Sequence, residues 1–331
     1  MNIWTISEQA SEQERSARIA EAAGHLAAVR LVVVPTETVY GLAADATNGE
    51  AVARIYEAKG RPSFNPLISH VASRAMADSQ GLFNENATKL AEAFWPGPLT
   101  LVLPKRPGSV ISDLATAGLD TLALRWPENP VTCAVIAKLG RPIAAPSANR
   151  SGRISPTTAD AAIGDLGDAV AMVIDAGPCR IGLESTIVAC VGDAPALLRP
   201  GGVPTEQIET LIGRPLVRHA GNINKPAAPG MLESHYAPHA VVRLNAREVA
   251  PDEALLAFGP FLPAGAESAK AVLNLSEAGD PVEAAANLFT WLRRLDASGA
   301  GTIAVAPVPE TGLGEAINDR LRRAAAPRET G

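Results

Sequence analysis

A short valine segment that ends at a proline constrains the fold of this chain more than any other feature. Residues 32–34 are all valine, which favours a buried strand, and Pro35 cannot continue the hydrogen-bond ladder of that strand. The chain then turns directly into the hydroxyls of Thr36 and Thr38. We interpret this stretch as a buried strand whose end presents polar groups to a small ligand. Both threonines could equally be strand formers with satisfied hydroxyls.

The next segment has the spacing of an amphipathic helix and ends between two cations. Asn48 can cap its first turn, and Gly60 stands where helices commonly end in the left-handed conformation. Lys59 and Arg61 flank that glycine. Cations beside hydroxyls can hold a polyphosphate. Cations at a helix C-terminus also complement the helix dipole, so a purely structural role stays open.

Length and composition bound the class of protein. A chain of 331 residues, with 47% hydrophobic and only 4% aromatic residues, indicates an ordered globular protein of two domains. The net charge of −6 argues against a protein that coats nucleic acid. Three cysteines in no metal-like spacing favour free thiols in a reducing compartment. Without a visible signal peptide, or an apolar run of the roughly 20 residues that span a bilayer, we expect a cytoplasmic protein without membrane contact.

The hydrophobic patterns divide the chain into three parts. In residues 1–213, strand and helix patterns mix irregularly, which predicts a twisted, mixed α/β sheet. Residues 214–240 are rich in proline, glycine and asparagine and read as a linker. Residues 241–331 alternate strand patterns with helical patterns at 281–295 and 315–323, which predicts a small parallel-sheet α/β domain of Rossmann-like type.

Several polar residues stand at the ends of short predicted strands. Ser147 and Asn149 follow a strand broken by proline, where turn chemistry alone would also place them. His70, in an apolar context, could be a core histidine. Arg125 and Arg199 are harder to explain structurally, because a cation in a buried strand requires an anion nearby. These residues are therefore candidates for an anion-binding site.

Familiar catalytic motifs are absent from the sequence. There is no G-x-x-x-x-G-K-[ST] phosphate loop, no H-E-x-x-H and no G-x-S-x-G, and Gly312 and Gly314 lack the third glycine of a dinucleotide-binding fingerprint. His235 and His239 have helical metal spacing, but Pro238 between them argues against a helix. We interpret both as linker histidines.

Five short motifs nevertheless occur in one order. They are Pro-Thr-Glu-Thr-Val-Tyr-Gly-Leu at 35–42, Lys-Gly-Arg-Pro at 59–62, Trp-Pro-Gly-Pro-Leu-Thr at 95–100, Pro-Ser-Ala-Asn-Arg-Ser-Gly at 146–152 and Glu-Ser-Thr-Ile at 184–187. Together they resemble the threonylcarbamoyladenylate synthase family, the YrdC-like domain. Pro-Gly-Met at 229–231 and His-Tyr-Ala-Pro at 235–238 resemble the linker of its long form, which has an extra C-terminal domain. Leu-Glu-Ser at 232–234 departs from the basic or aromatic residues of many long members.

The resemblance implies an enzyme that condenses L-threonine, bicarbonate and ATP into threonylcarbamoyl-AMP and pyrophosphate, for the threonylcarbamoyladenosine-37 modification of tRNA. Mg²⁺ would arrive with ATP, with no metal ligand from protein side chains. The implied catalytic residues are Lys59, Arg61, Ser147 and Asn149. The implied L-threonine site is Thr36, His70, Arg125, Ala145 and Ser185. The implied ATP site is Lys59, Ser63, Thr121, Ser147, Ser155, Arg199 and Tyr236, with Tyr236 on a linker that covers the nucleotide.

Two other functions stay open at this point. One is a carbamoyl-adenylating enzyme that uses another carbamate donor, and the other is an RNA-binding or regulatory module on the same fold. Acidic net charge and the lack of interleaved aromatic and basic residues count against the second. For the enzyme, the expected partners are its small-molecule substrates and the downstream threonylcarbamoyl-transferase machinery that acts on tRNA. A weak contact with tRNA itself is left open. We expect Lys59→Ala to abolish adenylate formation with little change in the thermal melt.

Overall fold

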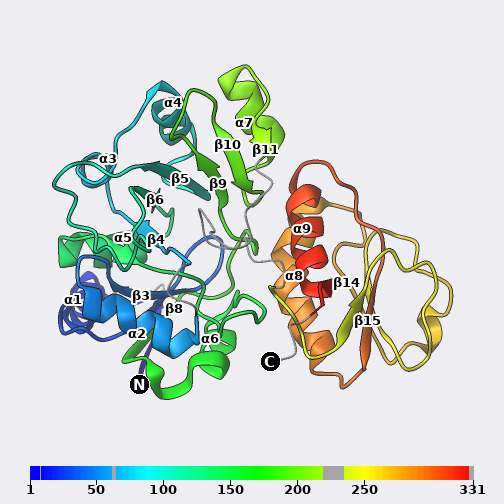
Figure 1. Cartoon of the computed structure of the whole chain (residues 1–331). Helices are drawn as coiled ribbons and strands as arrows, with labels where there is room; N and C mark the ends of the chain where they lie inside the picture. Colours follow the sequence, from blue (N-terminus) through cyan, green and yellow to red (C-terminus); the bar gives the residue numbers. More distant parts are fainter. Residues whose placement is uncertain (8, 62–64, 219–234, 328–331) are drawn as a thin grey trace.

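The computed structural model describes residues 1–7, 9–61, 65–218 and 235–327. These residues form two α/β units that lie side by side (Figure 1). Helices α8 (Pro281–Asp296) and α9 (Leu313–Ala325) of the second unit lie on the side that faces the first. The predicted fold class, a mixed sheet followed by a small parallel sheet, is confirmed.

The first unit is built on a mixed sheet that has eleven strands among the described residues. Strand β2, for example, pairs parallel with β8 and antiparallel with β3. In their order across the sheet, the strands are β1 (Asn2–Thr5), β8 (Met172–Asp175), β2 (Val32–Val34), β3 (Gly41–Asp45), β7 (Ile143–Ala144), β4 (Ile68–His70), β6 (Thr121–Arg125), β5 (Leu99–Pro104), β9 (Thr186–Ala189), β10 (Ala196–Arg199) and β11 (Val217–Arg218).

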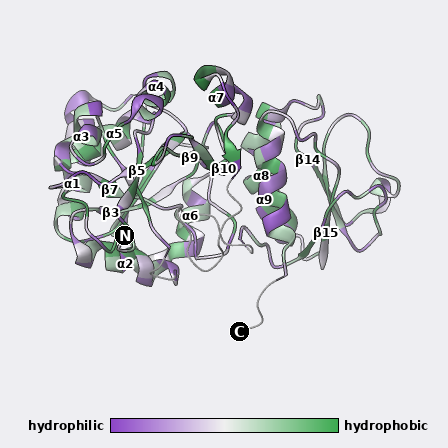
Figure 2. Cartoon of the chain, turned by 45° about the horizontal axis from the view of Figure 1, so that its top comes forward, coloured by the Kyte–Doolittle hydropathy of each residue, from purple (hydrophilic) through white to green (hydrophobic). Residues whose placement is uncertain are grey.

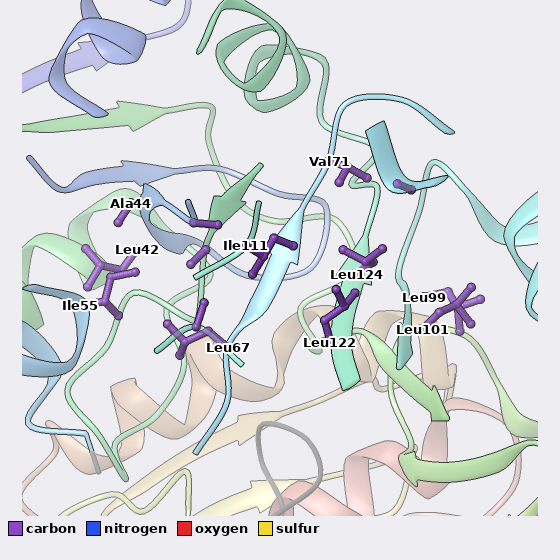
Figure 3. Packing of buried hydrophobic residues seen from close by; sticks show 14 of the residues in the cluster. Leu42, Ala44, Ile55, Leu67, Val71, Leu99, Leu101, Ile111, Leu122 and Leu124 are labelled. Carbon is purple, nitrogen blue, oxygen red and sulfur yellow. The ribbon is translucent and has the colours of Figure 1, made fainter. Parts of the chain in front are cut away.

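Helices cover both faces of this sheet, which explains why the valine strand is hydrophobic throughout. Val32 and Val34 pack toward the face that holds Leu26 of α1 (Glu12–Ala27), whereas Val33 packs toward the face that holds Ile55 of α2 (Gly49–Lys59). Figure 3 shows Ile55 beside Leu42 and Ala44 in this second layer. The helices are α1 (Glu12–Ala27), α2 (Gly49–Lys59), α3 (Arg74–Asp78), α4 (Glu85–Phe94), α5 (Pro130–Leu139), α6 (Ala159–Leu166) and α7 (Thr205–Ile212), with a 3₁₀ turn at Gly167–Ala169.

Some elements of the first unit escaped prediction. Strand β3 follows the hydroxyl-rich turn directly, but its sequence, Gly-Leu-Ala-Ala-Asp, has no β-branched residue and gives no strand signal. Pairing with β2 and β7 on either side decides its conformation. Strand β1 and the helices α3, α6 and α7 were likewise not predicted, because each is short or weakly periodic.

The second unit is a parallel sheet covered by α8 and α9. Its strands, in spatial order, are β12 (Val241–Arg243), β15 (Thr302–Val305), β13 (Ala254–Ala257) and β14 (Ala271–Asn274), with a 3₁₀ turn at Ala266–Ser268. Every pair of neighbours is parallel, as predicted. Figure 2 shows the two helices between this sheet and the first unit, where they bury residues such as Leu288, Phe289 and Ile317.

The predicted linker is only partly separate from the first unit. Strand β11 pairs with β10, so the first sheet extends five residues into the range 214–240. The motif residues 229–231 and 232–234 lie outside the described residues. The next described residue is His235. The amide of Ala237 donates to the carbonyl of Gly152 at 2.9 Å, which connects the end of the linker to the first unit.

Apolar residues of the first unit are part of the second unit's core. Val39, Ile154 and Leu183 pack in one buried cluster with residues of α8 and α9. The hydroxyls of Thr157 and Thr290 add a hydrogen bond of 2.8 Å across the same boundary. The two units therefore share a hydrophobic interface. No helix among the described residues has both the length and the apolar character needed to cross a membrane.

Candidate active site

The end of α2 holds a buried lysine. Asn48 caps the helix as predicted, and Gly60 ends it with a φ of 60°, which glycine adopts without steric cost. Lys59, just before that glycine, is 3% exposed. Its Nζ donates to the carbonyls of Ser147 at 2.6 Å and Asn149 at 2.5 Å. Burial, together with the charge of Arg61, lowers the pKa of Lys59. The lysine thus joins the helix end to the predicted Ser-x-Asn turn.

Arg61 extends from the same helix end into a small cavity. Its Nη2 donates to the carbonyl of Pro66 at 3.0 Å, which fixes the direction of the guanidinium. Burial lowers the pKa of Arg61 to about 10, so the side chain stays charged at neutral pH. Ser147 and Ala145 also line the cavity, on the chain that leaves β7. This part of the site is cationic.

Two neighbouring parallel strands supply the next pair of residues. His70 ends β4, Arg125 ends β6, and the two stand opposite each other in the strand register. Both line the same cavity. Burial, reinforced by the charge of Arg125, lowers the pKa of His70 to about 3. The imidazole is therefore neutral at physiological pH, and its Nδ1 is buried with no hydrogen-bond partner among the described residues.

Arg125 has the buried anion that its position requires. Nη2 of Arg125 lies 2.5 Å from Oε1 of Glu37, and both side chains are buried. Nε of Arg125 donates to the carbonyl of Gly97 at 3.2 Å. Oε2 of Glu37 accepts from the amide of Glu128 at 3.0 Å. The guanidinium is held from two sides, which fixes its plane.

A second arginine is fixed on the β9–β10 side. Nη2 of Arg199 donates to the carbonyl of Ser185 at 2.8 Å, and Nε donates to the same oxygen at 3.2 Å. The hydroxyl of Ser185 forms a 2.7 Å hydrogen bond with that of Thr100 on β5. Burial lowers the pKa of Arg199. Both Ser185 and Arg199 line the cavity.

The end of the linker covers this cavity. His235 and Tyr236 line it, and Tyr236 is 1% exposed. Tyr236 has a φ of 63°, which is uncommon for a residue with a side chain. Its ring stacks on Phe289 of α8 with the centroids 5.4 Å apart, so the second unit supports the tyrosine from behind.

The cavity is small and positively charged. Its volume is about 40 Å³, and its wall carries three arginines against one carboxylate, that of Glu184. Buried positive charge in excess favours an anionic ligand. A larger hollow of about 730 Å³ lies beside α2 and the start of β8, but none of the predicted site residues lines it. The small cavity is therefore the candidate site, because eight predicted residues line it: Arg61, His70, Arg125, Ala145, Ser147, Ser185, Arg199 and Tyr236.

Other predicted residues do not line this wall. Thr36 donates to the carbonyl of Val39 at 2.6 Å and so builds the turn after β2. Asn149 donates to the carbonyls of Arg150 and Arg153. Thr121 begins β6 at the end away from Arg125. Lys59 and Ser155 lie just behind the wall, and the hydroxyl of Ser155 donates to Glu184 at 2.6 Å. Ser63 lies outside the described residues.

Sequence reasoning missed several residues of the site. Glu184 belongs to the fifth motif, and its position directly before Ser185 was the available signal. His235 belongs to the linker motif, and no local pattern in the sequence marks it as a residue of the cavity wall. Val39, Ile68 and Pro146 complete the wall. Glu37, in the first motif, had no assigned role although it holds Arg125.

Family models match almost the whole chain. A model of the Sua5, YciO and YrdC group, described as "Telomere recombination", matches residues 25–201. A second model, described as "Threonylcarbamoyl-AMP synthase, C-terminal domain", matches residues 203–326. The two matches follow one another in the order of the two structural units.

Full-length relatives agree with these models. The threonylcarbamoyl-AMP synthase of Bacillus subtilis is 41% identical, with 98% of each chain covered. That of Pyrococcus abyssi is 42% identical, with 97% of this chain and 98% of the relative covered. The crystal structure of P. abyssi Sua5 complexed with L-threonine superposes with a TM-score of 0.88 at 38% identity, over 98% of both chains.

Such similarity over the full length settles the type of enzyme. The activity is the synthesis of threonylcarbamoyl-AMP from threonine, bicarbonate and ATP, a nucleotidyl transfer that serves the threonylcarbamoyladenosine modification of tRNA. The resemblance drawn from the five motifs is confirmed. The chain belongs to the threonylcarbamoyl-AMP synthase family, in its two-domain form.

Proposed function

We propose that the small cavity is where threonylcarbamoyl-AMP forms, and that it has an amino-acid end and a phosphate end. One observation carries the proposal: His70 and Arg125 stand side by side at the ends of β4 and β6, on a wall shared with Arg61 and Arg199. Arg125 forms one cationic group, and Arg61 and Arg199 form a second. Two such groups match the two substrates, because threonine carries a carboxylate and ATP carries a polyphosphate.

At the amino-acid end, Arg125 binds the carboxylate of threonine. Glu37 and Gly97 already hold two of its donors, so the guanidinium is oriented before the substrate arrives. The neutral ring of His70 and the hydroxyl of Ser185 can form hydrogen bonds to the substrate without adding charge. The carbonyl of Ala145, beside them on the wall, accepts from the amine. Thr36 acts indirectly, because its hydroxyl shapes the turn that precedes Val39.

At the phosphate end, Arg61 and Arg199 face the polyphosphate, and Ser147 lines the same cavity. Lys59 supports this end by holding the carbonyls of the 147–149 turn. Asn149 and Ser155 act in the same supporting way, through the turn and through Glu184. Tyr236 lies over the nucleotide. Thr121 is outside the cavity wall and is not part of this proposal.

The chemistry needs positioning and charge more than a protein nucleophile. Bicarbonate releases carbon dioxide and hydroxide, and the neutral amine of threonine attacks the carbon dioxide to form a carbamate. The proton lost by the amine combines with the hydroxide to give water, and a carbamate oxygen then attacks the α-phosphorus of ATP. The bond between the α-phosphorus and the bridging oxygen breaks, and pyrophosphate leaves with that electron pair. Fixed cations stabilise the charge that develops on the phosphates. Burial raises the pKa of Cys133 to about 11 and that of Cys190 to about 12, which makes these thiols poor nucleophiles at neutral pH.

Mg²⁺ would reach the site bound to ATP. Within the described ranges, no group of three or more histidine, cysteine, aspartate or glutamate side chains is arranged to hold a metal ion. The carboxylate on the cavity wall, Glu184, is already paired with Arg320 at 2.8 Å. The wall therefore suits the phosphates of a metal–nucleotide complex better than a free cation. When bound, the ion would neutralise charge on the departing pyrophosphate.

The cavity has to enlarge before ATP enters. Its volume of about 40 Å³ is far below the roughly 300 Å³ at which ligand pockets begin. Residues 235–236 form part of its wall and come from the linker, so movement of this segment opens the site most directly. Closure over the bound substrates would then keep water from the acyl-phosphate product.

We infer the cellular context of the enzyme from the chemistry of its product. Threonylcarbamoyl-AMP is labile, so a transferase that acts on tRNA has to consume it soon after release. Such a reaction belongs in the cytoplasm, and the free thiols of the three cysteines suit a reducing compartment.

Pyrophosphate release provides the test. We expect release from ATP only when L-threonine and bicarbonate are both present, and release without either one would favour another carbamate donor. We expect Arg125→Met to raise the KM for threonine at least tenfold while the KM for ATP changes little. Arg180→Met removes an exposed arginine that pairs with Glu128 at the surface, and it should leave both constants unchanged. Equal effects of Arg125→Met on both substrates would contradict the division of the cavity.

A further inference from the structure

A fully buried arginine connects the second unit to the wall of the active site. Arg320 lies in the middle of α9, and its side chain is 0% exposed. A buried charge is unfavourable unless it is paired. Nε of Arg320 donates to Oε2 of Glu184 at 2.8 Å, and Nη1 donates to Oδ2 of Asp319 at 2.6 Å. Its Nη2 has no hydrogen-bond partner among the described residues.

Arg320 contacts two residues of the cavity wall from behind. One is Glu184, whose other carboxylate oxygen accepts from Ser155 at 2.6 Å, so both of its oxygens are held. The second is Tyr236, whose ring centroid lies 5.3 Å from Cζ of Arg320. Tyr236 therefore contacts both a cation of α9 and Phe289 of α8.

The pairing of Glu184 decides how much positive charge the cavity presents. Although burial opposes ionisation of Glu184, the charges of Arg320 and Arg199 hold its pKa at about 2. The carboxylate is thus ionised and close enough to Arg199 to interact with it. Arg320 and Ser155 occupy the two oxygens of Glu184, and Arg199 donates to the carbonyl of Ser185.

We propose that Arg320 is a positioning residue for ATP, which holds Glu184 away from the phosphate-binding arginines and fixes Tyr236 over the nucleotide. The second unit is then a part of the active site itself. This inference rests on the proposed division of the cavity. The proposal has a consequence that can be measured. Without Arg320, the carboxylate of Glu184 turns to Arg199, and the phosphate end of the cavity loses positive charge. The threonine end keeps its own arrangement, because Arg125 is paired with Glu37.

The test compares affinities for the two substrates. We expect Arg320→Met to raise the KM for ATP at least tenfold and to leave the KM for threonine within about twofold, where tenfold corresponds to roughly 1.4 kcal/mol. Arg322→Met is the matched control, because Arg322 is an exposed arginine of the same helix that pairs with Glu310 at the surface. Glu184→Gln in the Arg320→Met background removes the competing carboxylate and should bring the KM for ATP back toward the native value. If Arg320→Met only damaged the fold, the additional Glu184→Gln substitution would not restore the KM for ATP.

Arg320→Lys covers the case in which the methionine variant does not fold, because lysine keeps the charge but lacks the guanidinium fork. It should melt near the native temperature and still bind a non-hydrolysable ATP analogue more weakly in calorimetry. Native affinity for the analogue in a folded Arg320 variant, or no recovery in the double variant, would overturn the inference. The proposed function is tested separately, by the dependence of native pyrophosphate release on threonine and bicarbonate.

Discussion

Nη2 of Arg125 and Oε1 of Glu37 lie 2.5 Å apart, and both side chains are about 95% buried. The two residues come from distant parts of the chain, the end of β6 and the turn after β2. This ion pair places a guanidinium at the end of a parallel strand with its charge compensated and its plane fixed. A cation prepared in this way can bind a carboxylate without reorganisation.

Removal of Glu37 should therefore affect both stability and threonine binding. In Glu37→Gln, Arg125 stays buried without its anion, and loss of one partner of a buried pair typically costs about 3–5 kcal/mol. We expect a loss of this size in urea unfolding, together with a raised KM for threonine. Glu128→Gln provides the control, because Glu128 forms an exposed pair with Arg180 that is worth less than about 1 kcal/mol. Similar losses in the two variants would contradict the role given to Glu37.

Acidification should destabilise the protein through His70. Burial and the charge of Arg125 lower its pKa to about 3, whereas the unfolded chain has a value of about 6.5. As the pH falls below 6.5, the unfolded state binds the proton first, and the free energy of unfolding decreases by about 1.4 kcal/mol per pH unit. Between pH 7 and pH 5 we expect His70 alone to contribute a loss of about 2 kcal/mol in urea unfolding. His235, whose pKa burial also lowers to about 3, adds a loss of its own over the same interval.

His70→Asn isolates this contribution, because asparagine does not titrate. The variant should lose about 2 kcal/mol less than the native protein over the same pH interval. Glu184, with its pKa of about 2, stabilises the fold above pH 4.5 and loses that contribution only below it, outside this window. Equal losses in the native protein and the variant would assign the pH dependence to other groups.

The environment of Lys59 changes what its removal should do. From sequence alone, Lys59→Ala was expected to abolish activity with little change in the melt. In the structure, Nζ satisfies two carbonyls in a buried turn, and each orphaned buried acceptor costs about 1–3 kcal/mol. We now expect Lys59→Met to lose activity and also about 2–4 kcal/mol of stability in urea unfolding. Lys89→Met, which removes an exposed pair with Glu85, should cost less than about 1 kcal/mol.

Residues of the site could be predicted from the sequence where the interactions that mark them are local. Arg125 and Arg199 were identified because a charge among strand-forming residues conflicts with its local context. Lys59 and Gly60 were identified because caps and helix ends depend on neighbouring residues. The α/β pattern of both units depends on hydrophobic periodicity, which is also local. Strand β3 lacked such a signal, since its conformation comes from pairing with β2 and β7.

Contacts between the two units had no signal in the sequence. Arg320 lies in a helix rich in arginine, where a solvated face is the ordinary interpretation, and only the docking of α9 on Glu184 makes it a buried residue. Val39 likewise seemed part of the first unit alone, but it packs in the core of the second. Pairings between residues more than a hundred positions apart depend on the tertiary fold, which no local pattern encodes.

The approach of the two units can be tested at one glycine. Gly182 has a φ of 73°, and a Cβ at this position would lie 2.5 Å from the carbonyl oxygen of Ala285 in the backbone of α8. Gly182→Ala should therefore push α8 away and disturb the pairing of Glu184, two residues further on, with Arg320. We expect lower stability and a raised KM for ATP, because the phosphate end depends on that pairing.

Gly177→Ala is the matched control for backbone strain. Gly177 has a φ of 76°, but no atom lies within 4 Å of the added Cβ. Both substitutions carry the left-handed penalty of about 1–2 kcal/mol, and the overlap with α8 should cost Gly182→Ala a further 1–3 kcal/mol or so. Thermal melts and steady-state kinetics measure the difference. If the two variants show the same melting temperature and the same KM for ATP, the close approach of α8 does not control the phosphate end of the site.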